Sequence, residues 1–255
     1  MNRVIVDCPD AESVAQLAAK QFVRRANDAI RERDVFRVAL SGGSTPKRMY
    51  ELLAEPGLAR QLDWGSVHIF FGDERAVGPD DDQSNFKTAH VGLLSHVGVP
   101  TGQIHRMAGE RGDLNLAARD YAAEIARVFG GSTTLPRFDL IFLGMGKDGH
   151  TASLFPHTAA LNETKAWVSA NDVPSMQTQR LTLSAPVINA ARSVVFTVAG
   201  ADKAEALRAV LQGGRDPQQY PSQLIAPQDG ELIWLVDQAA SAQLTLKLQN
   251  PANLA

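Results

Sequence analysis

Short apolar runs alternate with amphipathic segments along nearly the whole 255-residue chain, and this alternation constrains the fold more than any other feature. The runs are bounded by turn-forming residues, as buried strands are. They predict strands at residues 4–6, 36–40, 67–71, 140–143, 167–170, 181–183, 194–198 and 232–236. Strands that alternate with helices predict an α/β fold with a mostly parallel, doubly wound sheet covered on both faces.

The segments between the strands carry helical signals. After Pro9-Asp10, apolar residues recur with the 3.6-residue period of a core-facing helix, at positions 14, 17, 18, 22, 26 and 30. Further helices are expected after Pro46 and over residues 84–96, 113–129 and 202–211, with a helical turn at 186–191. The final residues, 239–255, are ambiguous. Because no repeat, low-complexity tract or linker interrupts the pattern, we expect one domain spanning residues 1–255.

Composition and charge exclude several classes of partner. The net charge is −3 and no basic run exceeds the pair Arg24-Arg25, so we expect neither nucleic acid nor an anionic membrane as partner. The single cysteine, Cys8, excludes an internal disulfide and fits a reducing compartment. With no signal-peptide core and no apolar span of about 18 residues, the expected location is the cytoplasm. We expect a monomer or a weak homo-oligomer.

The stretch from Phe138 to Pro156 is the most informative part of the chain. Its apolar run predicts a buried strand, and a glycine-rich turn then presents Lys147, Asp148 and His150. Glycine adds no core volume, whereas ligands of open α/β sheets bind beyond the carboxyl ends of strands. A lone histidine is more often structural than catalytic. Here, however, the setting favours His150 as a general base whose imidazole Asp148 orients.

The same turn also matches a dinucleotide-binding pattern. Gly144 to Gly149 satisfies G-x-G-x-x-G after a strand. That fingerprint requires an acidic residue at the far end of the next strand, where it holds a ribose hydroxyl. Glu163 lies before that strand instead, so we do not favour a dinucleotide and expect no cofactor.

A second polar segment, Ser41 to Lys47, joins a predicted strand to a helix. It places two glycines beside two hydroxyl side chains at a helix amino end, where unpaired N–H groups and the helix dipole attract anions. The alternative is an ordinary turn with a hydroxyl cap. The segment favours a phosphate site, although the G-x-x-x-x-G-K spacing of a nucleotide P-loop is absent.

A third polar cluster, Asp73-Glu74-Arg75, also follows a strand. Such clusters are usually solvated, but the planar guanidinium of Arg75 suits oxyanions and carboxylates. Arg180 and Lys203 stand at the ends of elements, where basic residues are common and alone suggest little. No metal is expected, because no H-x-H, H-E-x-x-H or cysteine cluster occurs and the other histidines lack ligand spacing to His150.

Taken together, these segments resemble the 6-phosphogluconolactonases of bacteria and plants, within the larger group that includes glucosamine-6-phosphate deaminase. The matching blocks are LSGGSTPKRMYELL at 40–53, FFGDERAVGPDDDQSNFKTA at 70–89, FDLIFLGMGKDGHTASLFP at 138–156 and RLTLSAPVINAARSVVFTVAGADKAEAL at 180–207. Three long, separate motifs make the resemblance specific, and it covers nearly the whole chain.

The resemblance implies a three-layer Rossmann-like sandwich of the sugar-phosphate isomerase/deaminase type. It also implies hydrolysis of 6-phospho-D-glucono-1,5-lactone in the pentose phosphate pathway without cofactor or metal. By motif, His150 corresponds to the general base with Asp148 beside it, Arg75 to an oxyanion-stabilising group and Asp73 to a pocket acid. The implied phosphate clamp comprises Ser41, Gly42, Gly43, Ser44, Thr45, Arg180 and Lys203.

Two alternatives are weaker. Deaminases carry a glutamate where this chain has Phe155, just before Pro156. A deaminase must move protons on an opened sugar, whereas a lactone is an activated acyl group that needs only water. The absence of the glutamate therefore disfavours deamination and leaves lactone hydrolysis intact. A non-enzymatic sugar-phosphate sensor on the same fold would keep the clamp and not the base, and the presence of His150 and Arg75 counts against it.

Overall fold

The computed structural model describes residues 2–131 and 134–254, so positions 132 and 133 of the loop before Phe138 lie outside it. Among the described residues, one large sheet has the strand order β1-β9-β8-β5-β2-β3, and all its neighbouring strands are parallel. Its strands are β1 Asn2–Cys8, β2 Phe36–Leu40, β3 Val67–Phe71, β5 Leu140–Leu143, β8 Ser193–Val198 and β9 Glu231–Asp237.

Helices connect most of these strands. They are α1 Ala11–Arg33, α2 Ser44–Ala54, α3 Pro56–Ala59, α4 Asn85–Ala89, α5 Leu114–Val128, α6 Ala185–Asn189, α7 Ala204–Gln212 and α8 Gln238–Ser241. Short 3-10 turns lie at Trp64–Ser66, Thr101–Gln103, Ala159–Asn162, Pro174–Met176, Ala201–Lys203, Pro221–Leu224 and Pro251–Asn253. Within the described residues, no helix is long and apolar enough to cross a membrane.

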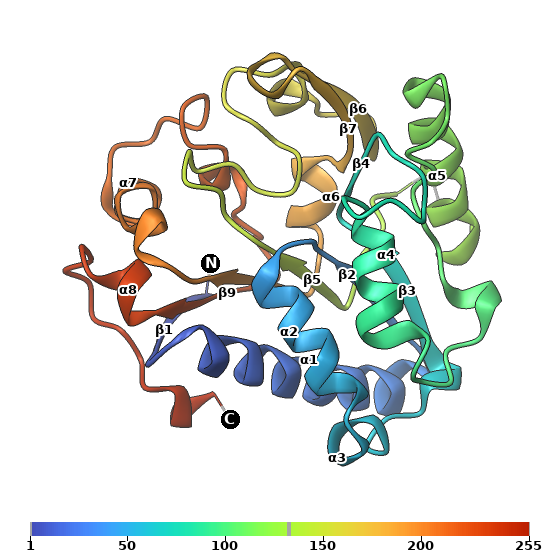
Figure 1. Ribbon diagram of the computed structural model, residues 1–255, viewed down its shortest axis with the longest axis horizontal. Helices are drawn as coiled ribbons and strands as arrows, with labels where there is room; N and C mark the ends of the chain where they lie inside the picture. Colours follow the sequence, from blue (N-terminus) through green and yellow to red (C-terminus); the bar gives the residue numbers. More distant parts are fainter. Residues whose placement is uncertain (1, 132–133, 255) are drawn as a thin grey trace.

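The large sheet separates two apolar cores, because successive side chains of a strand point to opposite faces. On one face, side chains such as Val38 and Phe142 pack with α1 and α2. On the other face, side chains such as Ile141 and Phe196 pack with α5, α6 and α7. Figure 1 shows α1 along one side of the strands and α5 on the other. Helices on both faces of a parallel sheet confirm the predicted three-layer α/β fold.

Two predicted strands lie outside the large sheet. The runs at 167–170 and 181–183 belong to β6 Val168–Val173 and β7 Thr178–Leu183, which pair antiparallel in a small sheet of order β4-β7-β6. The third strand, β4 Asp73–Arg75, is the charged cluster that the sequence suggested was a strand end. Buried parallel strands are almost continuously apolar, so strands that carry Asn171 and Arg180 suit a sheet with a polar side better.

The helix predicted at 84–96 is regular only over α4 and continues as a π-helical turn, His90–Leu94. Gly92 lowers helix preference within this segment and packs closely on Tyr50 of α2. Glu74 fixes the start of α4, because its buried carboxylate accepts hydrogen bonds from the N–H groups of Asn85 and Phe86 at 2.7 and 2.8 Å. Burial raises the pKa of Glu74 despite these bonds.

The chain leaves β2 and β5 in opposite directions, although the two strands are neighbours. From β2 it passes through α2 to β3 at one edge, and from β5 it continues to β8 and β9 toward the other edge. In open α/β sheets, such a switch point leaves a crevice beyond the carboxyl ends of the two strands. The segments after β2 and β5 are the two glycine-rich turns selected from the sequence.

Candidate active site

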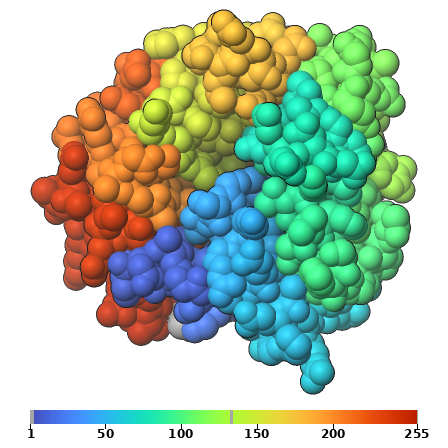
Figure 2. Space-filling model, in the orientation of Figure 1, coloured from blue at the N-terminus to red at the C-terminus, as the bar shows by residue number. Residues whose placement is uncertain are grey.

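A cavity of about 360 Å³ lies at this switch point. The segments after β2, β5 and β8 line it together with the small sheet. Figure 2 shows a hollow near the middle of one face, between the start of α2 in blue, the segment after β3 in teal and the segment after β5 in yellow-green. The predicted site residues that line the cavity are Ser41, Gly42, Gly43, Ser44, Thr45, Asp73, Arg75, His150, Arg180 and Lys203.

The segment after β2 presents a helix amino end to the cavity. Gly43 is the N-cap of α2 with φ of 113°, a left-handed conformation that favours glycine, and no side chain of the described residues caps this helix end. From behind, the hydroxyl of Tyr50 donates to the carbonyl of Ser41 at 2.6 Å. The first N–H groups of α2 are therefore available to an anion in the cavity.

Two guanidinium groups face each other on the small sheet. Arg75 of β4 lies directly opposite Arg180 of β7, so both side chains project from the same face. Among the described residues neither forms an ion pair; Arg75 donates to the carbonyl of Gln83, and Arg180 Nε has no partner. Burial and the charge of Arg75 lower the pKa of Arg180. Because directly opposed like charges repel, this wall is suited to an anionic group.

Lys203 reaches the cavity from the end of the 3-10 turn after β8. Its Nζ lies 2.8 Å from the exposed carboxylate of Asp202. Exposed ion pairs of this kind are weak, so the pairing leaves Lys203 able to turn toward a bound anion.

His150 and Asp148 form a pair at the turn after β5. His150 Nδ1 lies 2.5 Å from Asp148 Oδ1, and the imidazole is partly exposed to the cavity. Asp148 does not itself line the cavity. Burial acts to raise the pKa of Asp148, but the hydrogen bonds and charge of His150 outweigh it, so the pKa lies below its ordinary value. A carboxylate that accepts from Nδ1–H leaves Nε2 as the basic atom of the neutral ring.

Asp73 is held by two residues that the sequence interpretation did not select. Its Oδ2 accepts a hydrogen bond from the hydroxyl of Ser153 at 2.7 Å, and its Oδ1 accepts from the side-chain amide of Asn85 at 3.1 Å. Both residues are buried and line the cavity. Asn85 opens α4 beside the charged cluster and Ser153 follows His150 by three positions, so proximity to the motifs was the available signal.

The other histidines lie elsewhere. Nε2 of His96 is 2.9 Å from the carbonyl of Val91, and His157 and His105 contact Gln219 and Glu124, respectively. In the described part of the chain, no group of three or more His, Cys, Asp or Glu residues could hold a metal ion.

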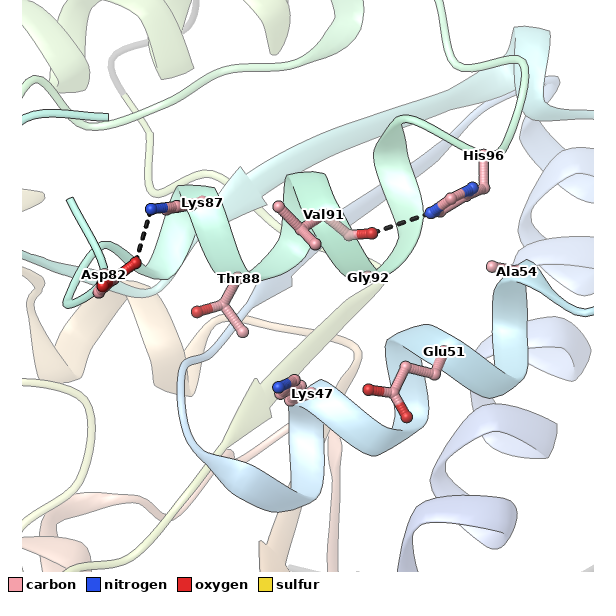
Figure 3. A pocket seen from close by; sticks show the side chains of 9 residues that line it. All are labelled: Lys47, Glu51, Ala54, Asp82, Lys87, Thr88, Val91, Gly92 and His96. Atoms are coloured by element: carbon pink, nitrogen blue, oxygen red, sulfur yellow. Dashed lines mark hydrogen bonds and ion pairs between the residues drawn. The ribbon is translucent and has the colours of Figure 1, made fainter. Parts of the chain in front are cut away.

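A larger hollow of about 560 Å³ lies between α2 and the segment around α4. In Figure 3, Lys47 and Glu51 of α2 face Thr88 and Val91, and Lys87 is paired with Asp82. None of the predicted site residues lines this groove. Lys47 closes the Ser41 to Lys47 segment in sequence, yet it belongs to the groove and not to the cavity. Size alone therefore does not identify the site.

Comparison with known proteins places the chain in a family. Residues 9–234 match the model for glucosamine-6-phosphate isomerases/6-phosphogluconolactonase. A 6-phosphogluconolactonase of Synechocystis sp. is 46% identical over 221 residues, which cover 86% of this chain and 89% of that protein.

Two solved structures extend the match. The crystal structure of a devB protein has a TM-score of 0.87 at 32% identity and covers 95% of this chain and 100% of its own. The 6-phosphogluconolactonase from Trypanosoma cruzi has a TM-score of 0.84 at 28% identity, covering 96% of this chain and 99% of its own. The chain therefore belongs to the family of glucosamine-6-phosphate isomerases and 6-phosphogluconolactonases.

Proposed function

We propose that this protein is a 6-phosphogluconolactonase, which hydrolyses 6-phospho-D-glucono-1,5-lactone to 6-phospho-D-gluconate in the oxidative pentose phosphate pathway. One observation carries the proposal: His150, whose ring Asp148 holds, lines the same cavity as two guanidiniums that form no ion pair within the described residues. The relatives from Synechocystis sp. and Trypanosoma cruzi are both named 6-phosphogluconolactonase. A phosphorylated lactone requires both a base for water and cations for its phosphate.

In this proposal, His150 is the general base. Nε2 takes a proton from a water molecule as the water oxygen attacks the lactone carbonyl, and the imidazolium gains support from the carboxylate of Asp148. The carbonyl oxygen becomes an oxyanion, which Arg75 stabilises from the cavity wall. When the tetrahedral intermediate collapses, the bond to the ring oxygen breaks and Nε2 returns the proton to that oxygen. Ring opening gives one product that carries both the new carboxyl group and the freed hydroxyl, and no covalent enzyme intermediate forms.

The phosphate group of the substrate is assigned to the start of α2. One side of the clamp consists of the first N–H groups of α2 and the hydroxyls of Ser44 and Thr45. The other side consists of Arg180 and Lys203, which come from distant parts of the chain. Asp73, held by Ser153 and Asn85, accepts a hydrogen bond from a sugar hydroxyl in this arrangement.

Deamination of glucosamine 6-phosphate is not proposed, because an apolar ring occupies position 155, where the resemblance places the deaminase glutamate. Phe155 lines the cavity beside His150 and can neither donate nor accept a proton. We further propose a cytoplasmic enzyme that uses no cofactor and acts without nucleic acid or membrane, as the net charge of −3 and the single free cysteine suggest.

Acid release from freshly prepared 6-phosphogluconolactone, corrected for spontaneous hydrolysis, tests the proposal. We expect enzyme-dependent hydrolysis that greatly exceeds the rate with unphosphorylated gluconolactone. Ammonia release from glucosamine 6-phosphate is the matched measurement for the alternative. Steady ammonia production without lactone hydrolysis would reverse the assignment.

A further inference from the structure

The ring of Phe155 covers one face of the His150 imidazole. The two ring centroids lie 4.1 Å apart with an interplanar angle of 24°, a stacked arrangement. Phe155 is only 6% exposed, so little of its ring is open to solvent. Both side chains line the cavity. The imidazole therefore meets a buried apolar ring on one of its two faces.

Two further contacts restrict the same imidazole. The carboxylate of Asp148 holds Nδ1, and the backbone of Gly146 lies against the Nδ1–Cε1 edge. A Cβ at position 146 would stand 2.1 Å from Nδ1 and 2.2 Å from Cε1, so this glycine is required for the ring to occupy its site. The second glycine of the G-x-G pattern thus makes room for an imidazole and not for a pyrophosphate. Among the described residues, Nε2 alone of the ring nitrogens has no hydrogen-bond partner.

We propose that Phe155 is a positioning residue for His150, which keeps Nδ1–H on Asp148 and Nε2 directed into the cavity. The inference deepens the proposed function and rests on it. A histidine on a turn can rotate about its side-chain bonds, and each rotation away from Asp148 would move the basic nitrogen. Stacking on a buried ring opposes such rotation, since offset-stacked aromatic pairs are favourable arrangements. General-base catalysis depends on this geometry because the base must reach the attacking water.

The key comparison is Phe155→Leu, which keeps apolar volume and removes the ring, with Phe155→Tyr, which retains the ring. We expect Phe155→Leu to lower kcat by about 10- to 100-fold with KM nearly unchanged, the size of loss that small misplacements cause. Phe155→Tyr should retain most of the activity. Phe138→Leu is the matched control, because Phe138 is equally a buried phenylalanine and lies outside the cavity. It should reduce stability without changing kcat.

A readout that needs no turnover separates this inference from the proposed function. ¹⁵N NMR of the neutral His150 ring should show one tautomer, protonated at Nδ1, in the unmodified protein and in Phe155→Tyr. In Phe155→Leu we expect a mixture of the two tautomers. If the tautomers change while the unmodified protein hydrolyses no lactone, positioning stands and the proposed function fails. An unchanged tautomer and an unchanged kcat in folded Phe155→Leu, or equal losses in both variants, would overturn the inference.

Discussion

The described part of the chain contains two histidine–carboxylate pairs of nearly equal length in very different settings. His150 Nδ1 lies 2.5 Å from Asp148 at the cavity, and His105 Nδ1 lies 2.7 Å from Glu124 near the β3 edge of the large sheet. The His150 side chain is 29% exposed, whereas that of His105 is only 2% exposed. The same pair of functional groups thus occurs once facing a cavity and once within packed structure.

The second ring nitrogen distinguishes the two pairs. Nε2 of His105 lies 3.0 Å from Nδ1 of His68, and the His105 ring stacks on Phe70 at 4.3 Å. Since Glu124 accepts from Nδ1–H, the network makes His105 Nε2 the acceptor for His68. No nitrogen of His105 remains for a substrate. A histidine–carboxylate pair therefore supports catalysis only where the remaining nitrogen is free and adjoins a cavity.

The largest difference between the pairs should appear when His150 is replaced. His150→Ala should lower lactone hydrolysis by about 100- to 10,000-fold, the usual contribution of a positioned general base. The fold should persist, because the side chain is partly exposed and lies in a turn. Steady-state kinetics and thermal unfolding of the same preparation check both statements. Near-normal turnover of a folded variant would show that His150 is not the base.

Arg180→Ala tests phosphate binding by the cavity wall separately from proton transfer by His150. Loss of one charged partner of the phosphate should cost about 1.5–3 kcal/mol, roughly 10- to 150-fold in kcat/KM for 6-phosphogluconolactone. The slow reaction with unphosphorylated gluconolactone should hardly change, because that substrate has no phosphate. Equal losses on both lactones would indicate a general structural defect, and no loss on either would remove Arg180 from the site.

His105→Ala should produce the opposite result to His150→Ala. It leaves Glu124 and His68 without their shared partner, so we expect the free energy of unfolding to fall by about 1–3 kcal/mol. The kcat of the folded variant should match the unmodified protein. Urea denaturation and kinetics below the transition measure the two quantities. A strong loss of kcat without destabilisation would contradict the view that the His105–Glu124 pair is structural and the His150–Asp148 pair catalytic.

The buried pair should also make stability depend on pH. Burial, aided by the charges of His105, Arg37 and Arg127, lowers the pKa of His68 to about 4, and burial lowers that of His105. In the unfolded chain both have a pKa of about 6.5 and bind protons more readily. The two neutral histidines therefore contribute their full stabilisation of the folded state above about pH 6.5. This contribution is lost as the pH falls toward about 4.

Glu124 remains ionised throughout that window, because hydrogen bonds from Arg127 and His105 hold its pKa at about 2. The melting temperature of His68→Gln should therefore change less between about pH 7 and about pH 4.5 than that of the unmodified protein. If the melting temperatures of the two proteins changed with pH by the same amount, His68 would not be a source of the pH dependence.

The smallest effect is expected from chelation. Neither pair belongs to a group of metal-binding residues in the described parts of the chain, and lactone hydrolysis needs only activated water. EDTA should leave the rate of hydrolysis unchanged. Loss of activity that one equivalent of a divalent ion restores would show that His150 works with a metal.

Local patterns predicted much of the fold and the motif positions. The apolar runs of β2, β3 and β5 and the helical period of α1 are repeated signals over several residues, so they identified buried elements. Periodicity could not assign β6 and β7 to a separate antiparallel sheet, because strand pairing depends on residues far apart in the chain. It also missed Asn85 and Ser153, whose importance comes from their contact with Asp73.

The sequence by itself determined the alternation of strands and helices and the chemistry available at each strand end, since composition and local spacing suffice for both. Only the tertiary structure decided which polar groups meet. Arg75 and Arg180 are opposed because β4 pairs with β7, and Asp148 holds His150 while Phe155 covers it because the turn folds back on itself. Among the described residues, Nε2 of His105 has a partner in His68 and Nε2 of His150 has none, and this difference depends on packing between distant segments, which no local pattern records.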